Sequence, residues 1–316
     1  MTLRDTPLGP GAEFDAIREM LRRWGPRARG IGDDAALIDV PPGEQLAVST
    51  DSSVEDVHFR RGWLTPREIG YRATVAALSD LAAIGAAPLG LVSALAVPDD
   101  WRGALHELTD GIGEAAERYR TPIVGGNITR GAKLSLTITV LGAVARPLPR
   151  SAVRPGDQLY LTGELGASGA ALDALLRGAA PLPTQRERFA RPTPRIAEAR
   201  WLAAHGATAA IDVSDGLLAE LAHLAAASGV RIELDASRVP VAADVARESA
   251  LRSGEEYELV VAGRSLDTVK FAAEHGVALT LIGRARELPG SAAPSVEVIG
   301  VDGSVASRAG HDHFSG

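Results

Sequence analysis

Six aspartates of this chain lie in four short islands flanked by Gly, Ser or Thr residues. The islands are Gly32-Asp33-Asp34, Ser49-Thr50-Asp51, Leu78-Ser79-Asp80 and Asp212-Val213-Ser214-Asp215-Gly216. Carboxylates that gather at one place repel one another strongly unless cations lie between them. Because the chain has no Cys, its oxygen ligands favour Mg²⁺, and Mg²⁺ held by carboxylates usually also holds nucleotide phosphates. The islands therefore predict an enzyme that uses magnesium and a nucleotide.

Apolar runs precede two of these islands and predict the strands that position them. Leu46-Ala47-Val48 leads into Asp51, and Ala209-Ala210-Ile211 leads into Asp212. We expect both strands to end at their carboxylates, so that the ends of the strands bring these groups to one edge of a sheet. For Asp215 alone, a second interpretation stays open, because it could cap the helix expected at 215–228.

Two further segments carry groups suited to phosphate or metal binding. Gly125-Gly126-Asn127 follows an apolar run, and paired glycines let a backbone approach a phosphate closely. Asn127 adds an oxygen ligand and two donors. Gly254-Glu255-Glu256-Tyr257-Glu258 contains three carboxylates within four residues. A plain turn for the first segment and a solvated turn for the second stay open as alternatives.

Two familiar nucleotide-binding motifs are almost present, and both fail. Lys133 stands one place too late for a P-loop that begins at Gly126, and Leu134 lacks the hydroxyl that must follow the lysine. Gly111-Ile112-Gly113 fits a loose dinucleotide pattern but falls within a helix expected at about 100–119. We interpret it as helix packing.

The predicted elements alternate between helices and strands in both halves of the chain. Many connections are too short for parallel crossovers, which favours mixed sheets in an α/β and α+β architecture. The Arg- and Pro-rich residues 146–150 indicate a linker, so we predict an N-terminal domain at 1–148 and a C-terminal domain at 149–316. The expected strands are 46–50, 89–97, 121–124, 134–145, 158–162, a strand ending at 212, 230–235, 257–262, 278–283 and 295–299. The other expected helices are 12–24, 65–85, 166–177, 194–204 and 265–275.

Composition excludes several functional classes. The formal charge is 33 − 40 = −7 and there is no basic run, so nucleic acid is not an expected partner. The absence of Cys excludes disulfides, thiolate zinc sites and cysteine nucleophiles. The N-terminus has no apolar signal segment, and no stretch approaches the roughly 18 apolar residues of a membrane span. We expect a cytoplasmic protein without a membrane partner.

Taken in order, the islands resemble the thiamine-monophosphate kinase family, which is similar to aminoimidazole ribonucleotide synthetase. The strings that carry the resemblance extend from residue 30 to residue 314. They are Gly30 to Ala36, Ser49 to Asp51 with Val57-His58-Phe59, Leu78 to Ala86, Gly125 to Gly131, Asp212 to Leu217, Gly254 to Leu259 and Asp312-His313-Phe314. The resemblance implies a two-domain aminoimidazole ribonucleotide synthetase-like fold whose N-terminal domain forms a homodimer through its sheet.

The same resemblance implies ATP-dependent phosphorylation of thiamine monophosphate, with several Mg²⁺ ions and no general base. The metal ligands that it implies are Asp34, Ser49, Thr50, Asp51, Asp80, Asn127, Asp212 and Asp215. The nucleotide contacts that it implies are Gly126, Asn127, Arg150 and Ser214, and the substrate contacts are His58, Glu255 and His311. This chain departs from the family pattern at Asn127, Glu256 and His311, where relatives commonly have Asp, Asp and an aromatic residue.

Four alternatives to this interpretation can be weighed against the sequence. A non-catalytic nucleotide-binding paralogue would have lost several carboxylates together, whereas here only Asn127 replaces one of the expected ligands. An aminoimidazole ribonucleotide synthetase-like ligase would not explain the string from Ser49 to His58. Selenophosphate synthetase and the hydrogenase maturation factor are disfavoured because the chain has no Cys.

Overall fold

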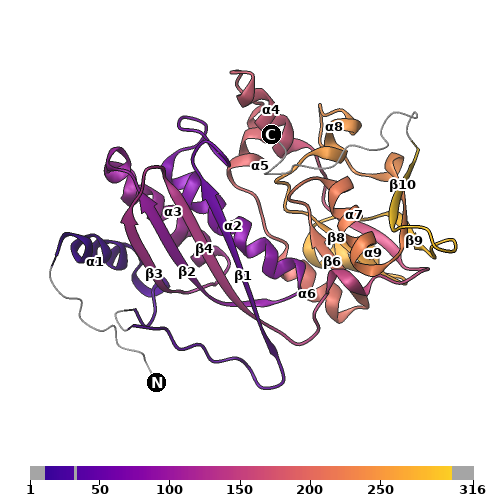
Figure 1. The fold of residues 1–316 in the computed structure, drawn as a ribbon, viewed down its shortest axis with the longest axis horizontal. Coiled ribbons are helices and arrows are strands. Elements are labelled where there is room, and N and C mark those ends of the chain that lie inside the picture. The colour runs from indigo at the N-terminus through magenta and orange to yellow at the C-terminus, as the bar shows by residue number, and fades with distance from the viewer. Residues whose placement is uncertain (1–10, 32–33, 301–316) are drawn as a thin grey trace. The chain divides into compact units, whose positions relative to one another are not determined.

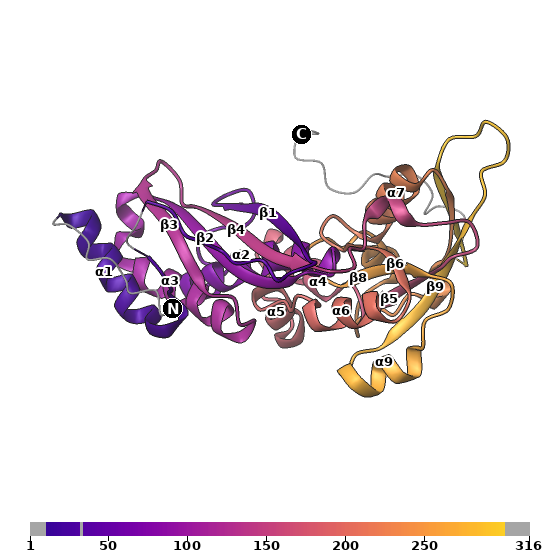
Figure 2. The ribbon, with the colours of Figure 1, turned by 90° about the horizontal axis from the view of Figure 1, so that it is seen from below.

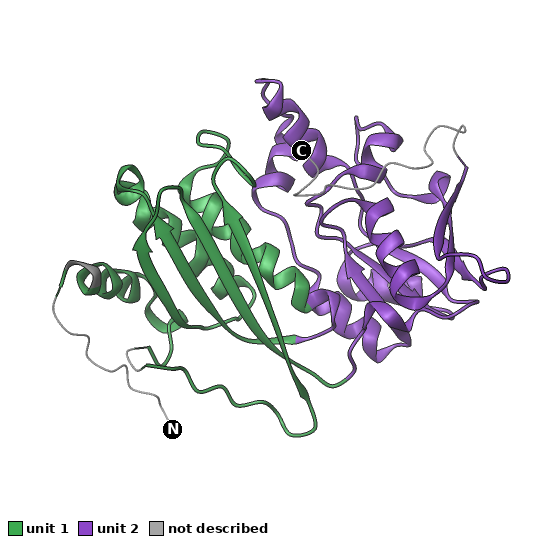
Figure 3. Ribbon diagram, viewed as in Figure 1, with its two compact units in different colours: residues 1–81, 87–145 green, residues 82–86, 146–316 purple. Residues whose placement is uncertain are grey.

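The computed structural model describes residues 11–31 and 34–300. The chain divides into two compact units, coloured separately in Figure 3. Unit 1 comprises Met1–Leu81 and Ala87–Ala145, and unit 2 comprises Ala82–Ala86 and Arg146–Gly316. The domain boundary expected at residues 148 and 149 stays a prediction, and the units are described below each by itself.

Unit 1 is built around a four-stranded sheet with the strand order β1-β4-β2-β3. The strands are β1 (Gln45–Val54), β2 (Ala87–Val97), β3 (Ile123–Arg130) and β4 (Ser135–Val144). β2 and β3 are parallel, whereas β4 is antiparallel to both β1 and β2, so the predicted mixed sheet is confirmed. The helical segments are α1 (Ala12–Trp24), η1 (Gly25–Arg27), α2 (Pro66–Ala83), η2 (Asp99–Ala104) and α3 (Leu105–Arg118).

Helices α2 and α3 cover one face of this sheet, as Figures 1 and 2 show. Leu136, Ile138 and Val140 of β4 are fully buried on the covered face, while Thr137 and Thr139 alternate with them. Helix α2 begins as its sequence predicts, because the Thr65 hydroxyl accepts from the Glu68 N–H at 3.2 Å and the Glu68 carboxylate accepts from the Thr65 N–H at 2.8 Å. The sheet and α2 together provide a rigid base for the side chains of β1.

Unit 2 is built around a six-stranded mixed sheet with the order β10-β7-β9-β5-β8-β6. Its strands are β5 (Gln158–Thr162), β6 (Ala207–Asp212), β7 (Arg231–Asp235), β8 (Leu259–Gly263), β9 (Leu279–Arg286) and β10 (Ser295–Ile299). Its helical segments are η3 (Arg150–Ala152), α4 (Ala167–Leu176), α5 (Pro183–Ala190), α6 (Ile196–Ala204), α7 (Leu217–Ser228), η4 (Ala236–Arg238), α8 (Arg247–Arg252) and α9 (Thr268–His275).

Both faces of the unit 2 sheet are covered by apolar packing. Leu159 and Leu161 of β5 point into a core that α7 completes with Leu217, Leu221 and Leu224. The residue between them, Tyr160, belongs to the core on the other face, which includes Leu202 of α6 and Phe271 of α9. This alternation follows from the two-residue period of a strand. It explains why the strands of unit 2 appear in the sequence as continuous apolar runs.

Two of the predicted strand boundaries are wrong near the site residues, and a third is wrong at β9, which ends at Arg286 instead of residue 283. β1 continues to Val54 instead of ending at residue 50, and β3 continues through Gly125, Gly126 and Asn127 to Arg130. The sequence also gave no prediction for α5 and α8. Within residues 11–31 and 34–300, no helix combines the length and the apolar character needed to cross a membrane.

Candidate active site

Strand β1 and helix α2 bring three of the predicted metal ligands to one face of the unit 1 sheet. Ser49 and Asp51 oppose Val140 and Ile138 of β4, so their side chains share the face that α2 covers. The Ser49 hydroxyl donates to Asp80 Oδ2 of α2 at 2.5 Å. Asp51 Oδ1 accepts from the Ser52 N–H at 2.7 Å. Two carboxylates and one hydroxyl therefore come from adjacent regular elements.

The remaining predicted residues near β1 are placed differently. The Thr50 hydroxyl lies on the opposite face of the sheet and pairs with the Thr139 hydroxyl at 3.0 Å. Asp34 is exposed and directly follows two residues that the structure does not describe. His58 follows the end of β1, and its Nδ1 accepts from the Val54 N–H at 3.2 Å. In the neutral imidazole this hydrogen bond places the proton on Nε2.

Gly126 and Asn127 lie within an edge strand and not in the strand-end loop that the sequence suggested. A Cβ atom at Gly126 would lie 2.4 Å from the Ser93 carbonyl oxygen, so this glycine permits the close approach of β3 to β2. Asn127 itself is exposed. The row Asp51–Ile138–Ser93–Gly126 crosses the sheet from β1 to β3. Three strand spacings separate its ends by about 14 Å, too far for Asp51 and Asn127 to bind one ion within the same sheet.

Unit 2 places Asp212 as predicted, at the end of β6, where its side chain is buried. Ser214 and Asp215 follow in the turn before α7. The cap interpretation of Asp215 is not supported, because Gly216 is the N-cap of α7 and no side chain caps it. Instead, the Asp215 N–H and the Ser214 hydroxyl both donate to Glu220 Oε1, at 3.0 and 3.2 Å.

The segment from Gly254 to Glu258 packs directly on the turn that holds Ser214. The Glu255 N–H donates to the Ser214 carbonyl at 2.7 Å, and the Tyr257 N–H donates to the Val213 carbonyl at 2.9 Å. Glu255 and Tyr257 both have positive φ values, of 59° and 55°. Non-glycine residues rarely adopt this conformation, and such strain tends to occur where surrounding contacts fix a functional segment. The structure thus brings two islands together that lie about 40 residues apart in the chain.

Three buried glutamates support these turns, and their roles could not be inferred from spacing. Glu258 is fully buried; it accepts from Arg195 Nε at 2.7 Å and from the Thr162 hydroxyl at 2.6 Å, and it also pairs with Arg188. Glu256 is also fully buried, and its Oε1 accepts from the Gly166 N–H at 2.9 Å, at the start of α4.

Burial raises the pKa of Glu256 above its usual 4.5, against the opposing effect of a hydrogen bond from Ser253. Burial likewise raises the pKa of Glu220, the third of these glutamates, and the nearby Asp215 charge acts in the same direction. The solvated-turn interpretation of the segment 254–258 is therefore wrong for Glu256 and Glu258.

Two further predicted residues complete the set. Arg150 is exposed in η3, and its main-chain carbonyl accepts from the Ser228 hydroxyl at 2.7 Å. His311 lies outside the described residues, so its predicted contact with the substrate stays a prediction.

The donor atoms of each unit suit Mg²⁺. Within the described part of the chain, no three His, Asp or Glu side chains gather closely enough to hold a metal by themselves. This arrangement fits Mg²⁺, which is usually bound through one or two carboxylates and completes its shell with water and substrate phosphates. The predicted carboxylate ligands are Asp51 and Asp80 in unit 1 and Asp212 and Asp215 in unit 2, two in each unit.

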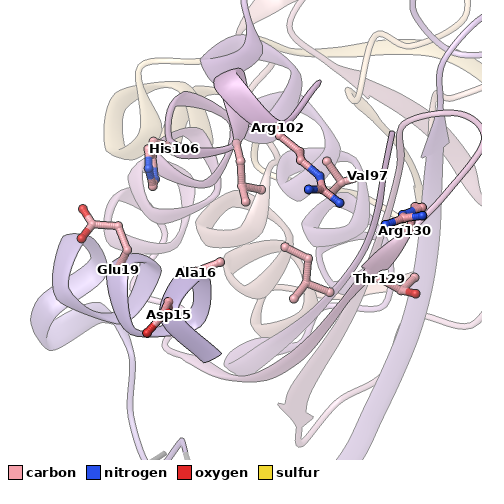
Figure 4. Close-up of a pocket in the computed structure, with 10 residues that line it drawn as sticks. Asp15, Ala16, Glu19, Val97, Arg102, His106, Thr129 and Arg130 are labelled. Carbon is pink, nitrogen blue, oxygen red and sulfur yellow. The ribbon is translucent and has the colours of Figure 1, made fainter. Parts of the chain in front are cut away.

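A separate cavity of about 640 Å³ lies in unit 1 between α1, the start of α3 and the ends of β2 and β3 (Figure 4). None of the predicted site residues lines it. Its acidic residues Asp15 and Glu19 pair with arginines of α1, and its residues Arg102 and Arg130 lie near Asp99. Because these charges are already compensated, we assign the cavity no part in the site.

Comparison with known proteins gives consistent matches over most of the chain. Residues 32–144 match the family described as AIR synthase related protein, N-terminal domain, and residues 154–293 match the corresponding C-terminal domain. Thiamine-monophosphate kinase of Bacillus subtilis is 36% identical over 298 residues, which cover 87% of this chain and 91% of the relative.

Two solved structures show the same architecture. Thiamine-monophosphate kinase from Stenotrophomonas maltophilia superposes with a TM-score of 0.80 at 36% identity, covering 92% of this chain and 97% of that one. The structure of AaThiL complexed with AMPPCP and TMP has a TM-score of 0.75 at 29% identity and covers 95% and 96% of the two chains.

Proposed function

We propose that this chain, which belongs to the thiamine-monophosphate kinase family, transfers the γ-phosphoryl group of ATP to thiamine monophosphate. The product is thiamine diphosphate. The observation that supports the proposal most strongly is the hydrogen bond between the proposed ligands Ser49 and Asp80, within a chain that is similar over most of its length to these kinases. A relative of the same fold carries an ATP analogue together with TMP.

The acceptor explains why the site needs no general base. A phosphate monoester has a second pKa near 6, so the terminal oxygen of thiamine monophosphate is already anionic at neutral pH. The remaining task is to bring two polyanions together and to stabilise the charge that spreads over the transferred group. Bound Mg²⁺ would supply this charge compensation. The residues proposed to hold it are Asp34, Ser49, Thr50, Asp51, Asp80, Asn127, Asp212 and Asp215.

The geometry of unit 1 favours several ions over one. Asp51 and Asn127 lie at opposite edges of the sheet, so each set of ligands would hold its own ion along the polyphosphate. We propose that Gly126, Asn127, Arg150 and Ser214 contact ATP and that His58, Glu255 and His311 contact thiamine monophosphate. His58 suits this role by its chemistry, because an imidazole whose Nδ1 accepts from the Val54 N–H carries its proton on Nε2, and an N–H is a hydrogen-bond donor for phosphate oxygens.

We further propose that the protein is a cytoplasmic homodimer formed through the unit 1 sheet. Leu46 and Val48 of the edge strand β1 are 49% and 58% exposed, which is unusual for two large apolar residues on neighbouring positions of one face. The substitution Val48→Lys should shift the protein from dimer to monomer in light-scattering measurements. A monomeric parent protein would contradict this part of the proposal.

The proposed function is tested by incubating the purified protein with ATP, Mg²⁺ and thiamine monophosphate and then separating the thiamine esters. We expect thiamine diphosphate to accumulate with Mg²⁺ and to be absent when the metal is removed with EDTA. The same yield in EDTA would contradict the metal-dependent mechanism. No thiamine diphosphate under either condition would contradict the proposed function itself.

A further inference from the structure

Glu220 connects the two polar groups that the turn before α7 offers to a ligand. Glu220 lies in the first turn of α7 and is 2% exposed. Its Oε1 accepts from the Ser214 hydroxyl at 3.2 Å and from the Asp215 N–H at 3.0 Å. We infer that Glu220 is a positioning residue that sets the geometry of Ser214 and Asp215 for binding of the magnesium nucleotide. This inference rests on the proposed function.

The backbone of the same turn is held from the other side. The Glu255 N–H donates to the Ser214 carbonyl at 2.7 Å. A Cβ atom at Gly254 would lie 2.6 Å from that carbonyl oxygen, and one at Gly216 would lie 2.8 Å from the Arg252 carbonyl oxygen. The main chain of the turn is therefore fixed by its contact with residues 252–255. Glu220 acts on the groups that this contact does not hold, which are the Ser214 hydroxyl and the Asp215 N–H.

The shared acceptor atom also determines which way the Ser214 hydroxyl points. Since Glu220 Oε1 already accepts from a backbone N–H, it acts as an acceptor toward Ser214 as well, and the serine must donate. Ser214 then presents only oxygen lone pairs to a ligand. Phosphate oxygens at neutral pH are acceptors, so the partner of Ser214 is a cation or a donor group of the nucleotide, such as a ribose hydroxyl.

Replacing Glu220 should disturb the turn without unfolding the helix that carries it. Ala is the best helix former, so Glu220→Ala retains the propensity of α7. Its first turn is also packed through Leu217 and Leu221, which are fully buried. Glu220→Gln keeps an oxygen that can accept both hydrogen bonds and removes only the charge. The two variants therefore separate loss of the contacts from loss of the charge.

The test measures MgATP binding by calorimetry and steady-state kinetics for both variants. We expect Glu220→Ala to raise the Kd and the KM for MgATP about tenfold and to leave the KM for thiamine monophosphate within twofold. Glu220→Gln should stay within threefold of the parent in every constant. In a cycle with Ser214→Ala, the double variant should lose less affinity than the two single losses added together, because Glu220 acts partly through Ser214.

A matched control is Ala226→Gly, which weakens α7 at an exposed position away from the turn. If Glu220→Ala binds MgATP like the parent, or if Ala226→Gly reproduces its changes, Glu220 has no positioning role. The outcome for the proposed function is separate. A parent protein that binds MgATP but does not convert thiamine monophosphate would refute the kinase proposal, while the binding constants still decide the role of Glu220.

Discussion

The two units carry similar predicted oxygen ligands but hold them in different ways. In unit 1, Ser49 and Asp51 lie in the middle of a strand and Asp80 lies on a helix, so regular hydrogen-bonded backbone fixes their positions. In unit 2, Ser214 and Asp215 lie in a turn, which depends on buried glutamates and on a strained neighbouring segment. Ligands on regular elements need little further support, whereas ligands on turns require a second layer of buried polar contacts.

The largest effect expected from this difference is the loss of stability when the buried ion pairs of Glu258 in unit 2 are broken. Glu258→Gln removes the buried charge that faces Arg195 and leaves that guanidinium with Glu198 as its counter-charge at 3.4 Å, which should cost about 3–5 kcal/mol of unfolding free energy. The measurement is urea-induced unfolding at neutral pH. The control is Glu233→Gln in the same unit, whose partners Arg284 and Arg286 are solvent-exposed, and it should cost about 1 kcal/mol or less. Equal losses of unfolding free energy in both variants would show that the buried ion pairs of Glu258 stabilise the protein no more than the exposed pairs of Glu233.

The second effect concerns catalysis and should be similar in the two units. Asp51→Asn and Asp212→Asn each remove a charge that would have few substitutes around the proposed cations. Each should lower turnover at least about a hundredfold, which corresponds to about 2.7 kcal/mol of activation free energy. Circular dichroism should show an unchanged fold, and Asp173→Asn on the exposed surface of α4 should have parental activity. Near-parental rates for both site variants at low Mg²⁺ would mean that these carboxylates are not metal ligands.

A smaller effect is the pH dependence of stability that comes from Glu256, one of the three buried glutamates of unit 2. Because burial raises the folded-state pKa of Glu256 above 4.5, the folded state binds this proton more tightly than the unfolded state. Its stabilising contribution is complete below the unfolded pKa and is lost as the pH rises through the folded pKa. Glu256→Gln imitates the protonated side chain, so the stability of this variant relative to the parent should increase as the pH rises above 4.5.

Each unit by which the pKa is raised corresponds to about 1.4 kcal/mol of this relative stability. Parallel unfolding curves for the two proteins across the pH series are the informative measurement. A difference in stability that does not change with pH would show that Glu256 is ionised equally easily in both states.

The smallest effect is expected at the opposite edge of the unit 1 sheet. Asn127→Asp adds an anionic ligand to β3 and should lower the Mg²⁺ concentration for half-maximal rate a fewfold. Asn127 is exposed, so the new charge has little desolvation cost and should not alter stability. A magnesium titration of the initial rate provides the test. An unchanged or higher requirement would indicate that residue 127 does not face a metal.

Most elements of the fold could be predicted from apolar periodicity, whereas the positions of the ligands on them could not. Helix α1 has the expected bounds, and α2 begins one residue after its expected start at Thr65. The end of β1 was misplaced because its apolar run stops at Val48, although Thr50 and Ser52 continue the ladder through hydroxyl pairs with β4.

The supporting roles of Glu220 and Glu258 in unit 2 could not be predicted from the spacing of residues. Glu220 and Glu258 are six and 44 positions away from Ser214, and ordinary sequence patterns place glutamates on the surface. Their burial follows only from the tertiary contacts with Ser214, Thr162 and Arg195. A buried carboxylate can be recognised only from the residues that pair with it, and these residues are far apart in the sequence.

The most direct test of the account compares two acceptors in the same assay, thiamine monophosphate and free thiamine, with ATP and saturating Mg²⁺. A site that positions two polyanions and supplies no general base should phosphorylate the monophosphate and leave the neutral hydroxyl of thiamine almost unchanged. We therefore predict a kcat/KM at least about a hundredfold higher for thiamine monophosphate. Equal or faster turnover of free thiamine would contradict both the assignment of the substrate and the proposed mechanism.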